Sequence, residues 1–155
     1  MPQVQFQIEA ANAADADRLA TIRVEAMRPS LEAVGRFDPV RARDRFLNSF
    51  RADDTKIIHA KDGVVGFFVL RRYPDHLYLD HLYVTLAFQG TGIGRRVIDD
   101  LKGEARSAAL PIRLMALNSS PANYFYRSCG FEFVSQDALD TLYQAPSEGL
   151  CVGLL

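Results

Sequence analysis

The sequence contains no tryptophan, only two cysteines, and no apolar run approaching the roughly 20 residues of a membrane-spanning helix. Cys129 and Cys151 lack CxxC spacing, which predicts reduced thiols, no zinc site and a cytoplasmic location. The three histidines, His59, His76 and His81, show no HExxH-type pairing, so we expect no metal cofactor.

An excess of charge of either sign is also missing. The 155 residues include 18 Lys and Arg against 19 Asp and Glu, a formal net charge of −1. This balance argues against a nucleic-acid partner. Residues 1–10 lack the basic-then-apolar order of a secretion signal, and we expect no membrane partner. With 48% hydrophobic residues, the chain is long enough for a single domain over residues 1–155.

Hydrophobic periodicity predicts a mixed α/β chain. Asn12 or Asp15 is expected to cap the first helix, and Pro29 to end it. Asp62-Gly63 reads as a hairpin turn, and residues 151–155 would add to a sheet edge or cover the core. The expected strands cover residues 3–9, 56–60, 64–72, 76–84, 111–117, 131–135 and 141–145. The expected helices cover about residues 12–27, 31–51, 93–107 and 121–129. Whether the second is continuous or broken is left open, and Pro39 marks a helix start within it.

Two of these helices carry clear local signals. The third helix has an apolar face at helical spacing, formed by Ile93, Val97, Ile98, Leu101 and Ala105. The fourth has Ser120 as a cap, Pro121 in the first helical position and Gly130 just past the end.

Three glycines, Gly90, Gly92 and Gly94, stand within five positions just before the third helix. Their spacing is not the dinucleotide fingerprint G-x-G-x-x-G, and the Lys-Ser/Thr of a P-loop is absent. Glycine permits positive φ and close approach, so amides at a helix start can converge on an anion. A diphosphate-binding loop and a plain turn both fit the glycines alone. A plain turn rarely needs three glycines and gives Gln89 no role, and Arg95 adds positive charge.

Two segments together resemble the GNAT superfamily of N-acetyltransferases. The stretch LYVTLAFQGTGIGRRVIDDL resembles the family's acetyl-CoA motif, Q/R-x-x-G-x-G/A after a strand ending in L-x-V. The stretch ALNSSPANYFYRSCGFEFV resembles its N-x-x-A-x-x-F/L-Y-x-x-x-G-F segment, at the separation that the family shows. The resemblance covers about residues 55–145.

The resemblance implies a GNAT fold with acetyl-CoA as cosubstrate. In that fold a mixed, mostly antiparallel sheet of six to seven strands is flanked by about four helices and splays between the fourth and fifth strands. Main-chain groups at the bulged end of the fourth strand would pair with pantetheine, and the glycine loop would hold the diphosphate. The implied contacts are Leu82, Tyr83, Val84, Gln89, Gly90, Thr91, Gly92, Ile93, Gly94 and Arg95.

The second motif departs from the family at its asparagine. Counting back from Tyr126, the family's asparagine position is Ser119, while Asn118 lies one residue earlier and Pro121 follows. Asn118, Ser119 and Ser120 therefore all remain candidates for a hydrogen bond to the cofactor.

The resemblance also points to the catalytic side chains. Tyr126 would act as the acid that protonates the departing thiolate, because a phenol pKa of about 10 lies close to a thiol pKa of about 8.5. His81 and Asp80 are the candidate bases, and as strand neighbours they face opposite sides of the sheet. A water chain is the alternative base. Cys129 is expected to pack rather than act as a nucleophile.

The acceptor pocket is expected from the loop predicted at residues 27–37 and the strand at 141–145. Its candidate lining residues are Arg28, Glu32, Tyr78 and Tyr143. The resulting hypothesis is direct acetyl transfer to a primary amine of a small molecule or peptide. A non-catalytic acyl-CoA-binding or sensing module and a pure interaction domain are the alternatives. A homodimer is also possible, paired through the C-terminal strands.

Overall fold

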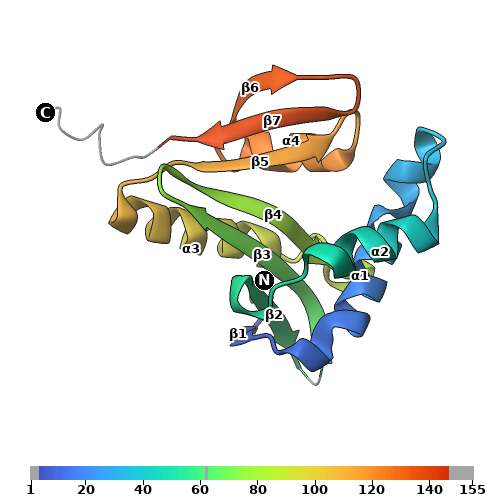
Figure 1. Ribbon diagram of the computed structural model, residues 1–155. Helices are drawn as coiled ribbons and strands as arrows, with labels where there is room; N and C mark the ends of the chain where they lie inside the picture. Colours follow the sequence, from blue (N-terminus) through green and yellow to red (C-terminus); the bar gives the residue numbers. More distant parts are fainter. Residues whose placement is uncertain (1–3, 62, 147–155) are drawn as a thin grey trace, which may run out of the picture. The chain divides into compact units, whose positions relative to one another are not determined.

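The chain is a mixed α/β protein in a computed structural model that describes residues 4–61 and 63–146 (Figure 1). Within these residues seven strands form one sheet in the order β1-β2-β3-β4-β5-β7-β6. The strands are β1 (Gln7–Ala10), β2 (Thr55–Ala60), β3 (Gly63–Tyr73), β4 (His76–Val84), β5 (Ile112–Leu117), β6 (Glu132–Gln136) and β7 (Asp140–Ala145). The helices are α1 (Ala16–Ala33), α2 (Pro39–Ser49), α3 (Ile93–Ala108) and α4 (Pro121–Ser128), with 3-10 turns η1 (Ala13–Asp15), η2 (Ala52–Asp54) and η3 (Leu86–Phe88).

The strand pairing confirms the predicted fold class. The β1/β2, β2/β3, β5/β7 and β6/β7 pairs are antiparallel, whereas β4 and β5 run parallel. This parallel pair is in register at Leu77↔Ile112 and Tyr78↔Arg113. A parallel pair needs a crossover, and α3 supplies it in the sequence between the two strands. How far β4 and β5 diverge beyond Tyr78 stays a prediction.

Residues cluster into two compact units, and each is described by itself. The first consists of residues 1–69 and 81–94, and the second of residues 70–80 and 95–155. The strands β3 and β4 each pass from one unit into the other along the chain. The predicted single domain over residues 1–155 stays a prediction.

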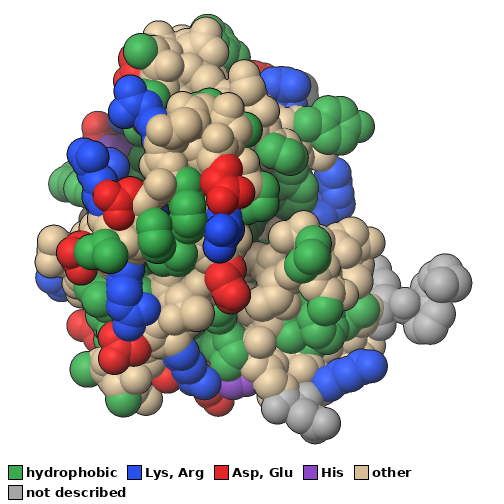
Figure 2. Space-filling view, turned by 90° about the vertical axis from the view of Figure 1, so that its right-hand side faces the viewer, with side chains coloured by type: hydrophobic (Ala, Val, Ile, Leu, Met, Phe, Trp, Pro, Cys, Tyr) green, Lys and Arg blue, Asp and Glu red, His purple; other side chains and the backbone are tan. Residues whose placement is uncertain are grey.

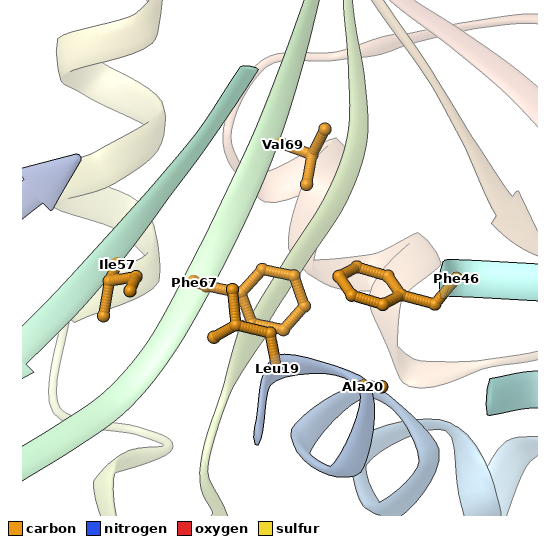
Figure 3. Packing of buried hydrophobic residues seen from close by; sticks show 6 residues of the cluster. All are labelled: Leu19, Ala20, Phe46, Ile57, Phe67 and Val69. Carbon is orange, nitrogen blue, oxygen red and sulfur yellow. The ribbon is translucent and has the colours of Figure 1, made fainter. Parts of the chain in front are cut away.

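The core of the first unit lies between the sheet and the pair α1 and α2 (Figure 3). The rings of Phe46 from α2 and Phe67 from β3 meet edge-on, with centroids 5.4 Å apart. Leu19 of α1 is fully buried beside them, and Ile57 and Val69 complete the cluster. Each such side chain contributes about 1.5–3 kcal/mol on burial, so this cluster fixes α1 and α2 on β2 and β3.

In the second unit the predicted periodicities are confirmed. On α3 the residues at helical spacing, Val97, Ile98 and Leu101, are at most 4% exposed. On β5, Ile112, Leu114 and Ala116 are buried, while the residues between them are more exposed. In Figure 1, α4 lies against the strands β5 and β7, so β5 is covered by a helix on the face of its apolar residues.

The prediction that Pro29 ends the first helix was wrong. Proline removes one backbone hydrogen bond, yet α1 continues through Pro29 to Ala33. The helix ends where Gly35 adopts φ +69°, with its N–H bonded to Glu32 and the Arg36 N–H bonded to Leu31. This glycine-dependent pair of bonds, a Schellman motif, sets the true end. The loop predicted at residues 27–37 is therefore mostly helix.

Other boundaries also differ from the prediction. The predicted strand at residues 3–9 is limited to Gln7–Ala10, and its first residue lies outside the described part. The region predicted as a second helix at residues 31–51 is broken: residues 31–33 belong to α1, and α2 begins at the predicted Pro39 start, after an Asp38 cap. Asp62 of the expected turn, residues 151–155 and Cys151 also lie outside the described residues.

Candidate functional site

The glycine loop joins β4 to α3 in the first unit. Gly90 and Gly92 adopt φ of +79° and +89°, conformations that favour glycine, and a Cβ added at either would meet no atom within 4 Å. Glycine is thus required here by the backbone conformation rather than by crowding. The space beside both residues is open, and both are exposed, so the main chain can be approached closely.

Side chains within the loop hold its conformation. The Gln89 amide donates to the Val84 carbonyl at 3.0 Å, and the Thr91 hydroxyl donates to the Phe88 carbonyl at 2.5 Å. Gln89 thus ties the loop to the end of β4. Its predicted contact with a cofactor stays a prediction.

The loop leads directly into the first turn of α3. Ile93 is buried and anchors the helix start, and Gly94 lies within the helix. N–H groups in the first turn of an α-helix have no acceptor within the helix, and the helix dipole makes this end favourable for anions. The loop and the helix start therefore fit a diphosphate.

Arg95 belongs to the second unit, where its guanidinium contacts the end of α4. It donates to the Ser128 carbonyl at 3.1 Å and to the Ser128 hydroxyl at 2.8 Å. A cation near the C-terminal carbonyls of a helix is favourable. Arg95 therefore links α3 to α4, a role that the sequence did not predict, and its proposed contact with phosphate stays a prediction.

The end of β4 approaches β3 very closely at a glycine. A Cβ on Gly66 would stand 2.2 Å from the Tyr83 carbonyl oxygen and 3.1 Å from the Val84 Cα. Just beyond, the Thr85 N–H donates to the Val65 carbonyl at 2.8 Å. Gly66 therefore sets the path of residues 82–84, the segment predicted to pair with pantetheine.

Asp80 and His81, the two candidate bases, have different environments. The Asp80 carboxylate accepts from Arg71 Nε at 3.2 Å and from Nη2 at 3.1 Å, and the Arg71 side chain is only 13% exposed. The His81 ring packs on Phe46 and Phe67, and its Nδ1 lies 3.1 Å from the Tyr83 hydroxyl. The neighbours thus have separate partners, Asp80 in the second unit and His81 in the first.

Tyr126 lies in α4 of the second unit and is 8% exposed. Its ring is edge-on to Phe125 and Phe131, with centroids 5.2 and 5.7 Å away. The Phe131 N–H also donates to the Tyr126 carbonyl, and Gly130 adopts φ +94° at this helix end. The glycine-phenylalanine pair after the helix thus fixes the tyrosine ring.

Asn118 fixes the β6–β7 hairpin rather than α4. Its Nδ2 donates to the Asp137 carbonyl at 2.9 Å, and its Oδ1 accepts from the Thr141 hydroxyl at 2.6 Å and from Gln136 at 3.2 Å. Ser119 has a positive φ of +69°. The Ser120 side chain makes no capping bond to the helix. Which of these three residues contacts a cofactor stays a prediction.

The residues proposed for the acceptor pocket have partners of their own. Arg28 Nε and Glu32 Oε2 form an ion pair with each other at 2.9 Å on α1, and both are exposed. Burial and nearby carboxylates raise the pKa of Tyr78 to about 12, so its phenol stays neutral. Tyr143 is 2% exposed. Arg28 and Glu32 neutralise one another, so neither presents an uncompensated charge.

One polar network in the second unit was not predicted. Tyr143 donates to Asn123 Oδ1 at 2.7 Å, and Arg127 Nη1 donates to the Tyr143 hydroxyl at 3.2 Å. Asn123 Nδ2 in turn donates to the carbonyls of Leu117 and Ser120. The network joins α4 to β5 and β7. An asparagine one turn before Tyr126, on the same side of this short helix, was the available signal.

The structure thus divides the predicted site residues between the units. The first unit contains His81 and residues 82–94, and the second contains Asp80, Arg95, Asn118, Ser120 and Tyr126. In the described part of the chain, no three His, Cys, Asp or Glu side chains come together as a metal site. No helix there is long and apolar enough to span a bilayer. On the face drawn in Figure 2, acidic and basic side chains are interspersed, as the balanced composition predicts.

The chain is thus an α/β protein with a mixed sheet and an open glycine turn at the start of its crossover helix. Residues 25–141 match the family model described as an acetyltransferase (GNAT) domain, and the chain belongs to this family. No curated protein sequence is significantly similar to it.

Several solved structures share the fold at low sequence identity. The PaiA N-acetyltransferase from Thermoplasma acidophilum, solved with coenzyme A, has a TM-score of 0.71 and 15% identity, covering 92% of this chain and 99% of its own. An acetyltransferase from Thermus thermophilus has a TM-score of 0.71 and 19% identity, and the match covers 94% of this chain and 99% of that protein. The ribosomal-protein-S18-alanine N-acetyltransferase from Escherichia coli has a TM-score of 0.70 and 15% identity, and the match covers 93% of this chain and 95% of that protein.

Proposed function

We propose that this protein transfers the acetyl group of acetyl-CoA to a primary amine of a small molecule or peptide. The observation that carries the proposal is the pair Gly90 and Gly92, with positive φ and open space beside them, directly before α3 in a GNAT family member. Amides of residues 90–95 would hold the diphosphate, with Arg95 as a nearby cation. Two similar structures are named N-acetyltransferases, which favours a nitrogen acceptor.

Acetyl-CoA supplies an activated thioester, and the side chains then manage two protons. The neutral amine attacks the carbonyl carbon directly, a C–N bond forms, the C–S bond breaks, and no acyl-enzyme arises. Tyr126 donates its phenolic proton to the departing thiolate. The proton lost by the amine nitrogen passes to the base, and the phenol is restored through solvent, so that amide and free thiol are the products.

The environments of the two candidate bases favour His81. The Asp80 carboxylate already accepts two hydrogen bonds from the Arg71 guanidinium, which hold it on that side chain. An imidazole has an ordinary pKa of about 6.5, suited to proton transfer near neutral pH. We therefore assign His81 as the base, acting directly or through water, and Asp80 with Arg71 as supporting residues.

Amine-dependent release of free thiol from acetyl-CoA tests the proposal. The purified chain is first heated with and without acetyl-CoA, and the cofactor should raise its melting temperature. Thiol release is then followed over amino acids, polyamines, aminoglycosides and peptide N-termini. Stabilisation followed by release with at least one amine class supports an N-acetyltransferase. Stabilisation without release from any amine contradicts it and favours a binding or sensing module, and no stabilisation favours an interaction domain.

A further inference from the structure

We propose that the second unit contains a separate binding site for a small organic carboxylate, between α4 and the β6–β7 hairpin. A cavity of about 370 Å³ opens there, within the size range of small-molecule sites. All of its lining residues belong to the second unit. The cavity shares Tyr143 with the predicted acceptor pocket, and Ser119 and Ser120 with the candidate cofactor contacts, but no step of the proposed acetyl transfer is assigned to it.

The least exposed part of the cavity lining, named the floor here, is polar and hydrogen-bonded. Asn123, Thr141 and Tyr143 line it and are 9%, 3% and 2% exposed. The Tyr143 hydroxyl donates to Asn123, and the Thr141 hydroxyl donates to Asn118. These bonds satisfy the buried polar groups and fix their orientation, so the floor is organised before any ligand arrives.

Arg127 gives the cavity its charge. It is exposed and uses one guanidinium nitrogen to donate to the Tyr143 hydroxyl at 3.2 Å. Among the described residues Arg127 has no carboxylate partner, and no acidic residue is found in the cavity lining that the structure describes. A guanidinium has five N–H donors, so several remain for a ligand. A single cation with no counter-charge among the described lining residues matches a single carboxylate, which guanidinium binds with two parallel hydrogen bonds.

The walls define the rest of the ligand. Tyr124 and Phe133 line the cavity and are 74% and 61% exposed, an unusual exposure for two aromatic rings on one rim. Aromatic rings pack well against flat apolar groups. The ligand class is therefore a carboxylic acid with a compact apolar or aromatic body, for which benzoate is a suitable probe.

Asn123, Tyr124 and Arg127 of α4 line the cavity. The helix α3 instead contacts the C-terminal end of α4, where Arg95 donates to Ser128 and Lys102 donates to the Cys129 carbonyl. Tyr126 does not line the cavity, but Ser119 and Ser120 do and are also candidate cofactor contacts, so the test includes coenzyme A.

The test is titration of the ¹⁵N-labelled protein with benzoate, followed by amide shifts. We expect saturable shifts in α4, β6 and β7, and binding at least about tenfold weaker for benzamide, which lacks the charge. Arg127→Gln should weaken benzoate binding by about tenfold or more, and Arg127→Lys should retain part of it. Phe133→Ala changes only an exposed ring and should weaken binding without lowering the melting temperature.

Several results would overturn this site. They are equal binding of benzoate and benzamide, unchanged affinity in Arg127→Gln, shifts confined to the glycine loop, or displacement of benzoate by coenzyme A. The titration requires neither acetyl-CoA nor turnover. A negative titration therefore does not test the proposed acetyl transfer, and absence of acetyl transfer does not test this carboxylate site.

Discussion

Gly66 on β3 lies so close to Tyr83 on β4 that a Cβ at position 66 would stand 2.2 Å from the Tyr83 carbonyl oxygen. That separation is far inside van der Waals contact, and the obstacle is backbone, which cannot rotate away. Residues 82–84 are the segment proposed to pair with pantetheine. A change at this contact should therefore affect both the stability of the sheet and the affinity for the cofactor.

Gly66→Ala is expected to lower both stability and affinity for acetyl-CoA. Overpacking in a core costs about 1–3 kcal/mol, and the shift here falls on residues 82–84. Chemical denaturation and calorimetric titration measure the two effects. Gly103→Ala is the matched control, because Gly103 lies within α3 with no atom within 4 Å of its Cβ position. It should stabilise the protein by about 0.5–1 kcal/mol. A Gly66→Ala protein as stable as the parent would refute this account of β4.

Gly92→Ala is expected to weaken acetyl-CoA binding beyond its effect on stability. Its φ of +89° is unfavourable for alanine, which costs about 1–2 kcal/mol, and relief of that strain would redirect the loop amides. Gly35→Ala is the control, because Gly35 also has a positive φ of +69° and no atom within 4 Å of its Cβ position. Both variants should lose stability, and only Gly92→Ala should lose affinity in calorimetric titration. Equal affinities would show that the loop does not bind the cofactor.

Tyr126→Phe should bind acetyl-CoA normally and lose most of its turnover. Loss of a general acid typically lowers kcat by about 100-fold or more. Tyr124→Phe serves as the control, since it removes a hydroxyl from the same helix at a residue that is 74% exposed. Steady-state thiol release and cofactor titration separate the two effects. If Tyr126→Phe turned over at the parent rate, Tyr126 would not be the acid.

Tyr143→Phe should destabilise the second unit. The substitution leaves the buried Asn123 Oδ1 without the 2.7 Å hydrogen bond that it now accepts. An unsatisfied buried acceptor costs about 1–3 kcal/mol. Urea denaturation should show this loss, and Tyr124→Phe should stay within about 0.5 kcal/mol of the parent. Equal stabilities of the two variants would mean that the network contributes nothing.

Asp15 should contribute stability that disappears in acid. The hydrogen bond from the Asn12 N–H is the largest effect that lowers the pKa of Asp15 in the folded state, and Arg18 lowers it further. Burial acts in the opposite direction. An Asp carboxyl in the unfolded chain has a pKa of about 3.9. The contribution is therefore complete above that pH and is lost as the pH falls through the lower folded value. The stability gap between parent and Asp15→Asn should close below pH 4. Asp44→Asn, at an exposed site, should show no such gap.

Much of the fold followed from local patterns in the sequence. The apolar spacing of Val97, Ile98 and Leu101 predicted α3, and Ser120, Pro121 and Gly130 predicted the limits of α4. The prediction at Pro29 failed because a proline inside a helix removes only one backbone hydrogen bond, whereas the positive φ of Gly35 ends the helix. Local sequence patterns include only the effects of neighbouring residues. They do not include the tertiary packing of Leu19 and Ala20, which stabilises the whole of α1.

The candidate site was predictable only where a motif fixed the backbone. The positive φ at Gly90 and Gly92 was predictable, because glycine alone occupies that region readily. The partners of Asp80 and Asn118 were not, because they come from Arg71 and from residues 136–141, and only folding brings them near. The Asn123–Tyr143–Arg127 network is long-range for the same reason.

The most direct measurement is a crystal structure of this chain grown with coenzyme A. The account predicts the diphosphate within hydrogen-bond distance of main-chain N–H groups between Gly90 and Arg95. Gly90 and Gly92 should still have positive φ. Coenzyme A bound elsewhere, or an empty loop at saturating cofactor, would contradict it.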